Sequence, residues 1–174
     1  EGKTQTTREK LIEYILEKEI ASGGWALFGS SADPDITAIA IQALAAYYGT
    51  DSRVTAAVDR AVARLSAMQK EDGGFGSWGS VNSESCAQVV VALTALGIDP
   101  AADARFIKSG NSVMDALLSF AVEGGGFRHM AGGGVNGMAT EQGYCALAAY
   151  DRLRSGRTFL YDMTDVIPLN AYES

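Results

Sequence analysis

Two carboxylic acids separated by one proline are the residues of this chain best suited to acid chemistry. Asp33, Pro34 and Asp35 stand directly before an uncharged, apolar stretch. A carboxyl group can act as a general acid when its surroundings tune its pKa. The same residues also suit the start of a helix, because Asp33 can cap the first turn and the macrodipole favours an anion at Asp35 by ~0.3 to 1 kcal/mol. We expect the helix-capping role, with catalysis by Asp35 and Asp33 as the alternative.

The sequence offers little for a metal ion or a disulfide. The two cysteines, Cys86 and Cys145, form no CxxC pair, and the single histidine, His129, lies in a glycine-rich stretch. Metal sites and disulfide frameworks are recognised from clustered cysteines and histidines. We therefore predict no metal and no cofactor, and we interpret His129 as a solvated loop residue.

Glycine marks three loops that repeat along the chain. Of the 20 glycines, 14 fall within residues 23–29, 73–79 and 124–137. Each loop contains a Gly-Gly-aromatic triplet, and the aromatic residues Trp25, Phe75 and Phe127 are 50 and then 52 positions apart. A fixed period of this length indicates structural repeats. The glycine pairs allow the chain to leave one helix in a left-handed conformation and enter the next.

Between the glycine loops, two kinds of helix alternate. Amphipathic segments are predicted at residues 6–20, 52–69 and 112–122, and uncharged segments at 36–48, 85–97 and 143–150. An amphipathic helix buries one face, whereas a helix that is apolar all round is buried all round. The pattern predicts an all-α single domain over residues 1–174, in which an outer helix, a glycine loop and an inner helix recur. The repeats cover residues 7–49, 50–98 and 99–155, and a tail follows at 156–174.

One acid begins each inner helix, and parallel inner helices bring such acids to one mouth of the assembly. We expect this mouth to hold a cation or a basic ligand. For the repeated aromatic residues Trp25, Phe75 and Phe127 we expect packing between hairpins, with a place on the ligand-binding rim as the alternative. The rim candidates are Asp35, Glu84, Glu141, Trp25, Phe75, Trp78 and Phe127.

Composition excludes two classes of partner. The net charge of -7 and the scattered basic residues argue against nucleic acid, because phosphate binding needs a concentrated basic surface. No apolar run approaches the ~18 residues that a membrane span needs.

The first residues contain neither an initiator Met nor an apolar signal core, so we expect the chain to begin within a longer protein.

The repeats resemble a known family. Gln69-x3-Gly73-Gly74-Phe75 is similar to the QW motif of squalene and hopene cyclases, and the Gly-Gly-aromatic repeats resemble those of protein prenyltransferase β-subunits; in the first repeat Glu19 replaces the Gln. This resemblance implies an α/α toroid, here a partial ring of three helical hairpins. It fits best with repeat domains of bacterial surface proteins that are joined to a transcobalamin-like module.

The enzymatic relatives each require residues that this chain matches in part. Class II terpene cyclases use Asp-x-Asp-Asp, and here Ile36 replaces the last acid after Asp35. Prenyltransferases hold zinc with Asp, Cys and His, to which Glu84-Ser85-Cys86 is only faintly similar. Complement thioester domains use Cys-Gly-Glu-Gln, and Thr140-Glu141-Gln142 keeps only the last two residues.

The sequence therefore predicts a non-catalytic binding or spacer module. The resemblance implies an exported or cell-surface bacterial protein. Its partner would be an unknown small molecule or surface ligand, and a missing half-ring or self-association would cover the exposed edge helices. Two alternatives remain open. One is a cyclase-like isomerase with Asp35 as general acid, and the other is a transcobalamin-like carrier of a small ligand.

Overall fold

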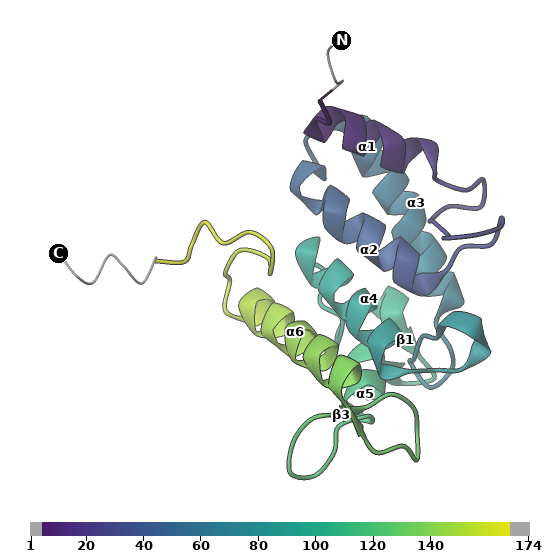
Figure 1. Cartoon of the computed structure of the whole chain (residues 1–174), viewed down its shortest axis with the longest axis vertical. Helices are drawn as coiled ribbons and strands as arrows, with labels where there is room; N and C mark the ends of the chain where they lie inside the picture. The colour runs from purple at the N-terminus through teal and green to yellow at the C-terminus, as the bar shows by residue number, and fades with distance from the viewer. Residues whose placement is uncertain (1–4, 168–174) are drawn as a thin grey trace.

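The computed structural model of the chain describes residues 5–167, apart from the side chain of Trp78, and contains both helices and short strands (Figure 1). The α-helices are α1 (Arg8–Glu17), α2 (Pro34–Leu44), α3 (Ser52–Met68), α4 (Ser83–Ala95), α5 (Val113–Leu118) and α6 (Gly137–Arg154). Single-turn 3-10 helices are η1 (Ala45–Tyr47), η2 (Ser77–Gly79) and η3 (Ala104–Phe106). The strands are β1 (Ile107–Lys108), β2 (Asn111–Ser112), β3 (Phe127–Arg128) and β4 (Val135–Asn136).

The prediction of an all-α fold, in the form of a partial α/α toroid of three helical hairpins, is wrong. Strands β1 and β2 form one antiparallel pair, and β3 and β4 form another. Ser109 and Gly110 join the first pair, and their φ angles of 48° and 85° are both positive, as a type I′ turn requires. Strands β3 and β4 are joined by the longer loop 129–134, in which Gly132 has a positive φ of 79°. The fold is therefore mixed α and β.

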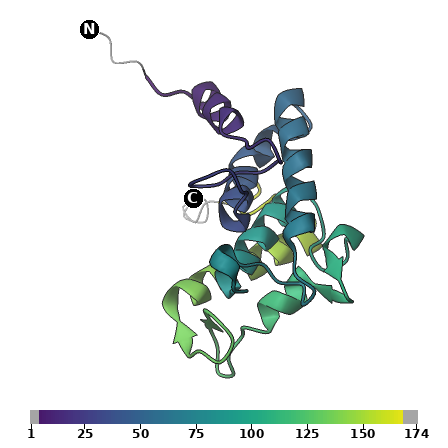
Figure 2. The same cartoon turned by 90° about the vertical axis from the view of Figure 1, so that its right-hand side faces the viewer.

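The three inner helices pack side by side, as the repeat predicts. Helix α4 lies between α2 and α6 and contacts both, and the two views of the chain show this order from α2 to α6 (Figures 1 and 2). Gln42 donates to Gln88 Oε1 at 2.9 Å, and Gln88 donates to Gln142 Oε1 at 3.1 Å. A chain of glutamine side chains therefore links all three helices.

The outer helices pack differently from the predicted repeats. Helix α3 packs on α2, and α5 packs on α4, so these two inner helices each pair with the outer helix that follows them. The connections that follow α2 and α4 are free of glycine pairs, whereas the long glycine loops precede the inner helices. Helix α1 contacts α3, and none of its residues is buried. No helix within residues 5–167 combines the length and the apolar character that a bilayer crossing requires.

The aromatic residues of the three loops occupy equivalent positions. Trp25, Phe75 and Phe127 are all buried. The backbone N–H of each donates to a side chain four residues after the N-cap of the next inner helix. These acceptors are Thr37 at 3.0 Å, Cys86 at 3.4 Å and Thr140 at 2.9 Å. The prediction that the inner helices pack together with their aromatic residues in equivalent places is confirmed.

The loops themselves turn in the same way in each repeat. Lys70 N donates to Gly74 O at 3.0 Å, and Gly73 N donates back to Lys70 O at 2.9 Å. Ile20 with Gly23 and Gly24, and Val122 with Gly125 and Gly126, make the same two bonds. The buried Gln69 side chain donates to Gly73 O and to Phe106 O, which ties the middle loop to the segment before β1.

The close approach at Gly73 predicts a large loss of stability for Gly73→Ala and a smaller one for Gly79→Ala. Both glycines have positive φ, so either alanine loses ~1 to 2 kcal/mol through the left-handed backbone. Only the new methyl group at Gly73 would also collide with the carbonyl of Ser112, whereas nothing lies near Gly79. We expect Gly73→Ala to lower the free energy of unfolding in urea by at least ~3 kcal/mol. Equal losses in the two variants would contradict the predicted collision.

Candidate functional site

A groove opens where the first and third glycine loops meet the starts of α2 and α4. Its volume is about 710 Å3. The lining residues of the first loop are called one bank below, and those of the β3–β4 loop and the start of α6 are called the other. The floor carries the carboxylates Asp33, Asp35 and Glu84, together with Ser77 from η2. This groove combines the volume of a ligand pocket with several converging polar groups.

Asp33 caps α2 and keeps its charge well compensated. Its Oδ1 accepts from the backbone N–H of Asp35 at 2.9 Å and of Ile36 at 3.1 Å. Its Oδ2 accepts from the Ser77 hydroxyl at 2.7 Å. These bonds satisfy N–H groups that the first turn of a helix otherwise leaves without partners.

The carboxylate of Asp35 has fewer hydrogen-bond donors than that of Asp33. Burial raises the pKa of Asp35, although the hydroxyls of Ser85 and Ser77 lower it in part, and the charges of Asp33 and Glu84 raise it further. Oδ2 of Asp35 lies 2.9 Å from Ser77 Oγ, while the buried Oδ1 has no hydrogen-bond partner of good geometry.

Ser77 contacts two carboxylates but has one hydroxyl hydrogen. It can donate to Asp33 or to Asp35 at any moment, and the other contact then lacks a hydrogen. If the Asp35 carboxyl is protonated, it can donate back to Ser77 Oγ, and both contacts are satisfied. The shared hydroxyl therefore stabilises the Asp35 carboxylate only in part, and burial leaves the pKa of Asp35 raised.

Glu84 pairs with the only histidine of the chain. Its Oε2 lies 2.8 Å from Nδ1 of His129 and accepts from Ser83 Oγ at 3.1 Å. The backbone of Ser83 also donates to the carbonyl of His129 at 3.1 Å. His129 is an exposed loop residue, as the sequence predicts, and two contacts also fasten its loop to the start of α4.

The banks of the groove are apolar and open to solvent. Leu27 and Phe28 stand on one bank, and Met130 and Met138 stand on the other. Phe28 is 80% exposed and Met138 is 64% exposed. Large apolar side chains gathered at a groove mark an interaction site more often than single exposed ones do.

The groove contains two of the three acids predicted at the mouth. Asp35 and Glu84 each lie two residues after the N-caps Asp33 and Asn82. The N-cap of α6 is Asn136, so Glu141 lies five residues into its helix, where it is exposed and accepts from Cys145 Sγ at 3.4 Å. Met138 holds the place equivalent to Asp35. The third member of the rim is thus apolar, and Glu141 is not part of the site.

The aromatic rim candidates lie below the groove. Trp25, Phe75 and Phe127 are buried between the helices and do not line it. Trp25 Nε1 donates to the carbonyl of Ile15 at 2.7 Å, and Phe127 packs edge-on against Tyr144. These three residues pack between the helices, as the expected packing role requires. Trp78 belongs to η2, but its side chain lies outside the part of the chain that is described.

The partial enzyme motifs are not assembled into sites. Cys86 is buried against the backbone of Phe75, and burial raises the pKa of its thiol to about 12. His129 contacts Glu84 rather than this thiol. Gln142 accepts from Gln88 in the chain of glutamines between the inner helices. Within residues 5–167, no group of three potential ligands could hold a metal ion.

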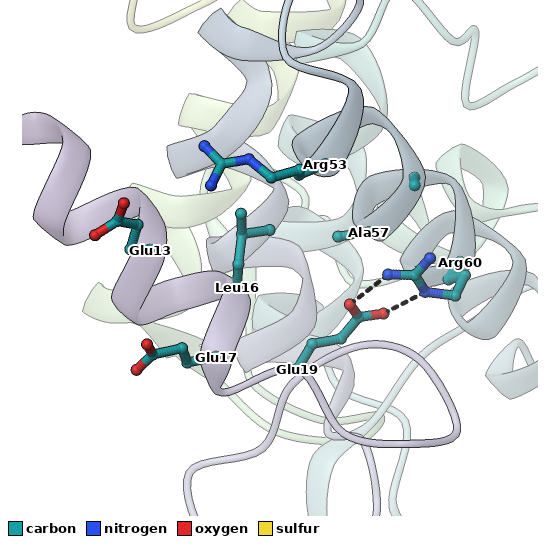
Figure 3. Close-up of a pocket in the computed structure, with 8 residues that line it drawn as sticks. Glu13, Leu16, Glu17, Glu19, Arg53, Ala57 and Arg60 are labelled. Carbon is teal, nitrogen blue, oxygen red and sulfur yellow. Dashed lines mark hydrogen bonds and ion pairs between the residues drawn. The ribbon is translucent and has the colours of Figure 1, made fainter.

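A second cleft of about 560 Å3 separates α1 from α3 (Figure 3). It is lined by charges of both signs, including Glu13, Glu19, Arg53 and Arg60. Glu19 reaches across to Arg60 with two bonds of 2.8 and 2.7 Å, which Figure 3 shows as dashed lines, and Arg53 pairs with Asp51. The two arginines of this cleft are therefore already paired within the chain, so the groove is the better candidate.

The raised pKa of Asp35 predicts how stability depends on pH. A carboxyl group whose folded pKa lies above its unfolded value binds protons preferentially in the folded state, so the parent chain gains stability as pH falls through the folded pKa towards the unfolded one. We expect Asp35→Asn to change the free energy of unfolding by at most about 1 kcal/mol at pH 7 and to remove this gain between pH 7 and pH 4. Urea titrations at several pH values measure both quantities.

Ser77→Ala is the matched variant for this experiment. Loss of the hydroxyl removes a hydrogen bond that lowers the pKa of Asp35, so the gain in stability should begin at a higher pH than in the parent. Parallel pH profiles for the parent and Asp35→Asn would contradict the raised pKa.

Comparison with known proteins identifies no family for this chain. No protein-family model matches it, and no curated protein matches it either. The similarity of its Gly-Gly-aromatic repeats to the cyclases thus stands as a resemblance of motifs. The functional argument rests on the groove and its side chains.

Proposed function

We propose that this chain is a non-catalytic binding module and that the groove is its ligand site. The observation that carries the proposal is the combination of exposed apolar banks with a carboxylate floor in a groove of about 710 Å3. Exposed Leu, Phe and Met side chains are costly in water unless a partner covers them. The carboxylates below add a polar element that can orient that partner.

The openness of the groove supports binding rather than cyclisation. A cyclase encloses a hydrocarbon in a dry cavity and stabilises its cations with aromatic faces. Among the lining side chains that are described, Phe28 is the only aromatic one, and it is mostly exposed. Trp25 and Phe75 are buried in packing, so their faces are not offered to a substrate.

One observation favours a second candidate, a cyclase-like isomerase that uses Asp35 as general acid. Burial raises the pKa of Asp35, which favours a proton on its carboxyl, although the contact with Ser77 lowers the pKa in part. A protonated carboxyl beside an apolar bank is the first requirement for protonating an alkene. Protonating an alkene also requires that water is excluded, and the open groove does not exclude it.

The exported or cell-surface setting is also a proposal. It rests on the resemblance of the repeats to those of bacterial surface proteins, and nothing in the geometry of the groove depends on it.

Indole, a small neutral aromatic compound, tests the groove as a ligand site. We expect indole to shift the backbone NMR signals of the first glycine loop and the β3–β4 loop, because it covers their exposed apolar side chains. The double variant Phe28→Ser and Met138→Ser should abolish these shifts with little loss of stability, since both side chains are exposed. Leu118→Ser on α5 removes an exposed apolar side chain outside the groove and is the control. Shifts that cluster elsewhere would overturn the assignment.

Incubation with squalene and shorter polyprenyl substrates tests catalysis. We expect no cyclised product from the parent chain or from Asp35→Asn, as judged by mass spectrometry of the extracted lipid. Turnover by the parent that disappears in Asp35→Asn would replace the binding proposal with the cyclase-like one.

A further inference from the structure

We propose that the occupant of the groove is an extended peptide segment with a lysine or arginine between apolar side chains. This inference rests on the proposed binding function and names its ligand. Three observations support it. They are the charges of the floor, the pairing of Glu19 and Asp165 with arginines elsewhere in the chain, and the apolar banks.

The floor of the groove lacks a cation that would match its acids. Asp33, Asp35 and Glu84 line it, and the lining residues that are described include no lysine or arginine. His129 is the one basic side chain there, and its Nδ1 faces Glu84. Asp33 and Asp35 therefore have no basic partner at this floor. A positively charged group that entered between the banks would contact both carboxylates.

Elsewhere the chain pairs an arginine with two acids whose side chains are only 12% and 25% exposed. Glu19 accepts two bonds from Arg60, and Asp165 lies 2.5 Å from Arg152 Nη2. Asp35 is also partly buried, but it receives contacts from serine hydroxyls only. A lysine or arginine from a partner would supply at the groove what Arg60 and Arg152 supply elsewhere.

The apolar banks decide between a peptide and a simple cation. A small amine or an inorganic ion would leave Leu27, Phe28, Met130 and Met138 in water. Apolar residues on both sides of a lysine or arginine would cover these side chains while the charge reaches the floor. The flexible methionine side chains can adapt to neighbours of different shape. The negative floor also repels phosphate-bearing ligands.

Two matched peptides test the proposal. One is acetyl-Gly-Phe-Lys-Leu-Gly-amide, and the other carries acetylated lysine, which keeps the shape but loses the charge. We expect the lysine peptide to bind about 10-fold more tightly at low salt, with shifts in the same two loops, and to lose this preference as salt is added. Chemical-shift titration of the full chain measures both affinities.

A pair of variants isolates the charge of the floor. Met138→Lys places a cation on the exposed bank, whereas Met138→Gln removes the apolar side chain without adding charge. We expect Met138→Lys to weaken the lysine peptide at least about 5-fold more than Met138→Gln does, and to affect the acetylated peptide no more than Met138→Gln does. Because this side chain is exposed, both variants should fold, which circular dichroism can verify.

The outcomes separate this inference from the proposed function. Equal affinity for the two peptides, with indole still bound in the groove, would overturn the cationic peptide and leave the binding site standing. Spermidine that binds as tightly as the lysine peptide would show that a simple polyamine suffices and would also overturn the inference. Failure of indole and of both peptides to reach the groove would overturn both proposals.

Discussion

Side-chain bonds to the backbone of an aromatic residue hold each repeat together. Thr37 Oγ1 accepts from the N–H of Trp25 and donates to its carbonyl, both at 3.0 Å. Cys86 with Phe75, and Thr140 with Phe127, make the same pair of contacts. These bonds satisfy backbone groups that would otherwise be buried without partners, and they set the distance between each glycine loop and the helix that follows. The burial of the aromatic rings depends on this geometry.

The groove is a consequence of this arrangement. Because each aromatic residue is fastened one turn into an inner helix, each helix start lies directly beside its own loop. The parallel packing of α2 and α4 then brings Asp33, Asp35 and Glu84 together. Burial of the aromatic rings leaves other loop residues, such as Phe28 and Met130, to form the banks. The structural and binding roles therefore fall on different residues of the same loops.

The pairing of helices also explains where the chain is loosely packed. Helices α2 and α4 are each covered by the outer helix that follows them, and α1 has no inner helix before it within residues 5–167. Its side chains are at best half-buried, and the cleft in Figure 3 lies between it and α3. At the other end, residues 158–165 fold back on α6, where Arg152 Nη2 lies 2.7 Å from Thr158 Oγ1 and 2.5 Å from Asp165 Oδ1. Thr158 and Asp165 are thus fastened to the last turn of α6.

Sequence alone determined the repeat, the three inner helices, the cap at Asp33 and the burial of the aromatic residues, because these features follow from local periodicity and turn chemistry. The sequence did not reveal where α6 begins, because the third loop is longer than the other two. Only the structure shows that Met138, not Glu141, holds the place equivalent to Asp35. The strands were missed because Ser109-Gly110 is a weak turn signal between short segments. The contacts of Ser77 with Asp33 and Asp35, and of His129 with Glu84, join residues more than 40 positions apart. Only the packing of one helix start against another could bring such residues together.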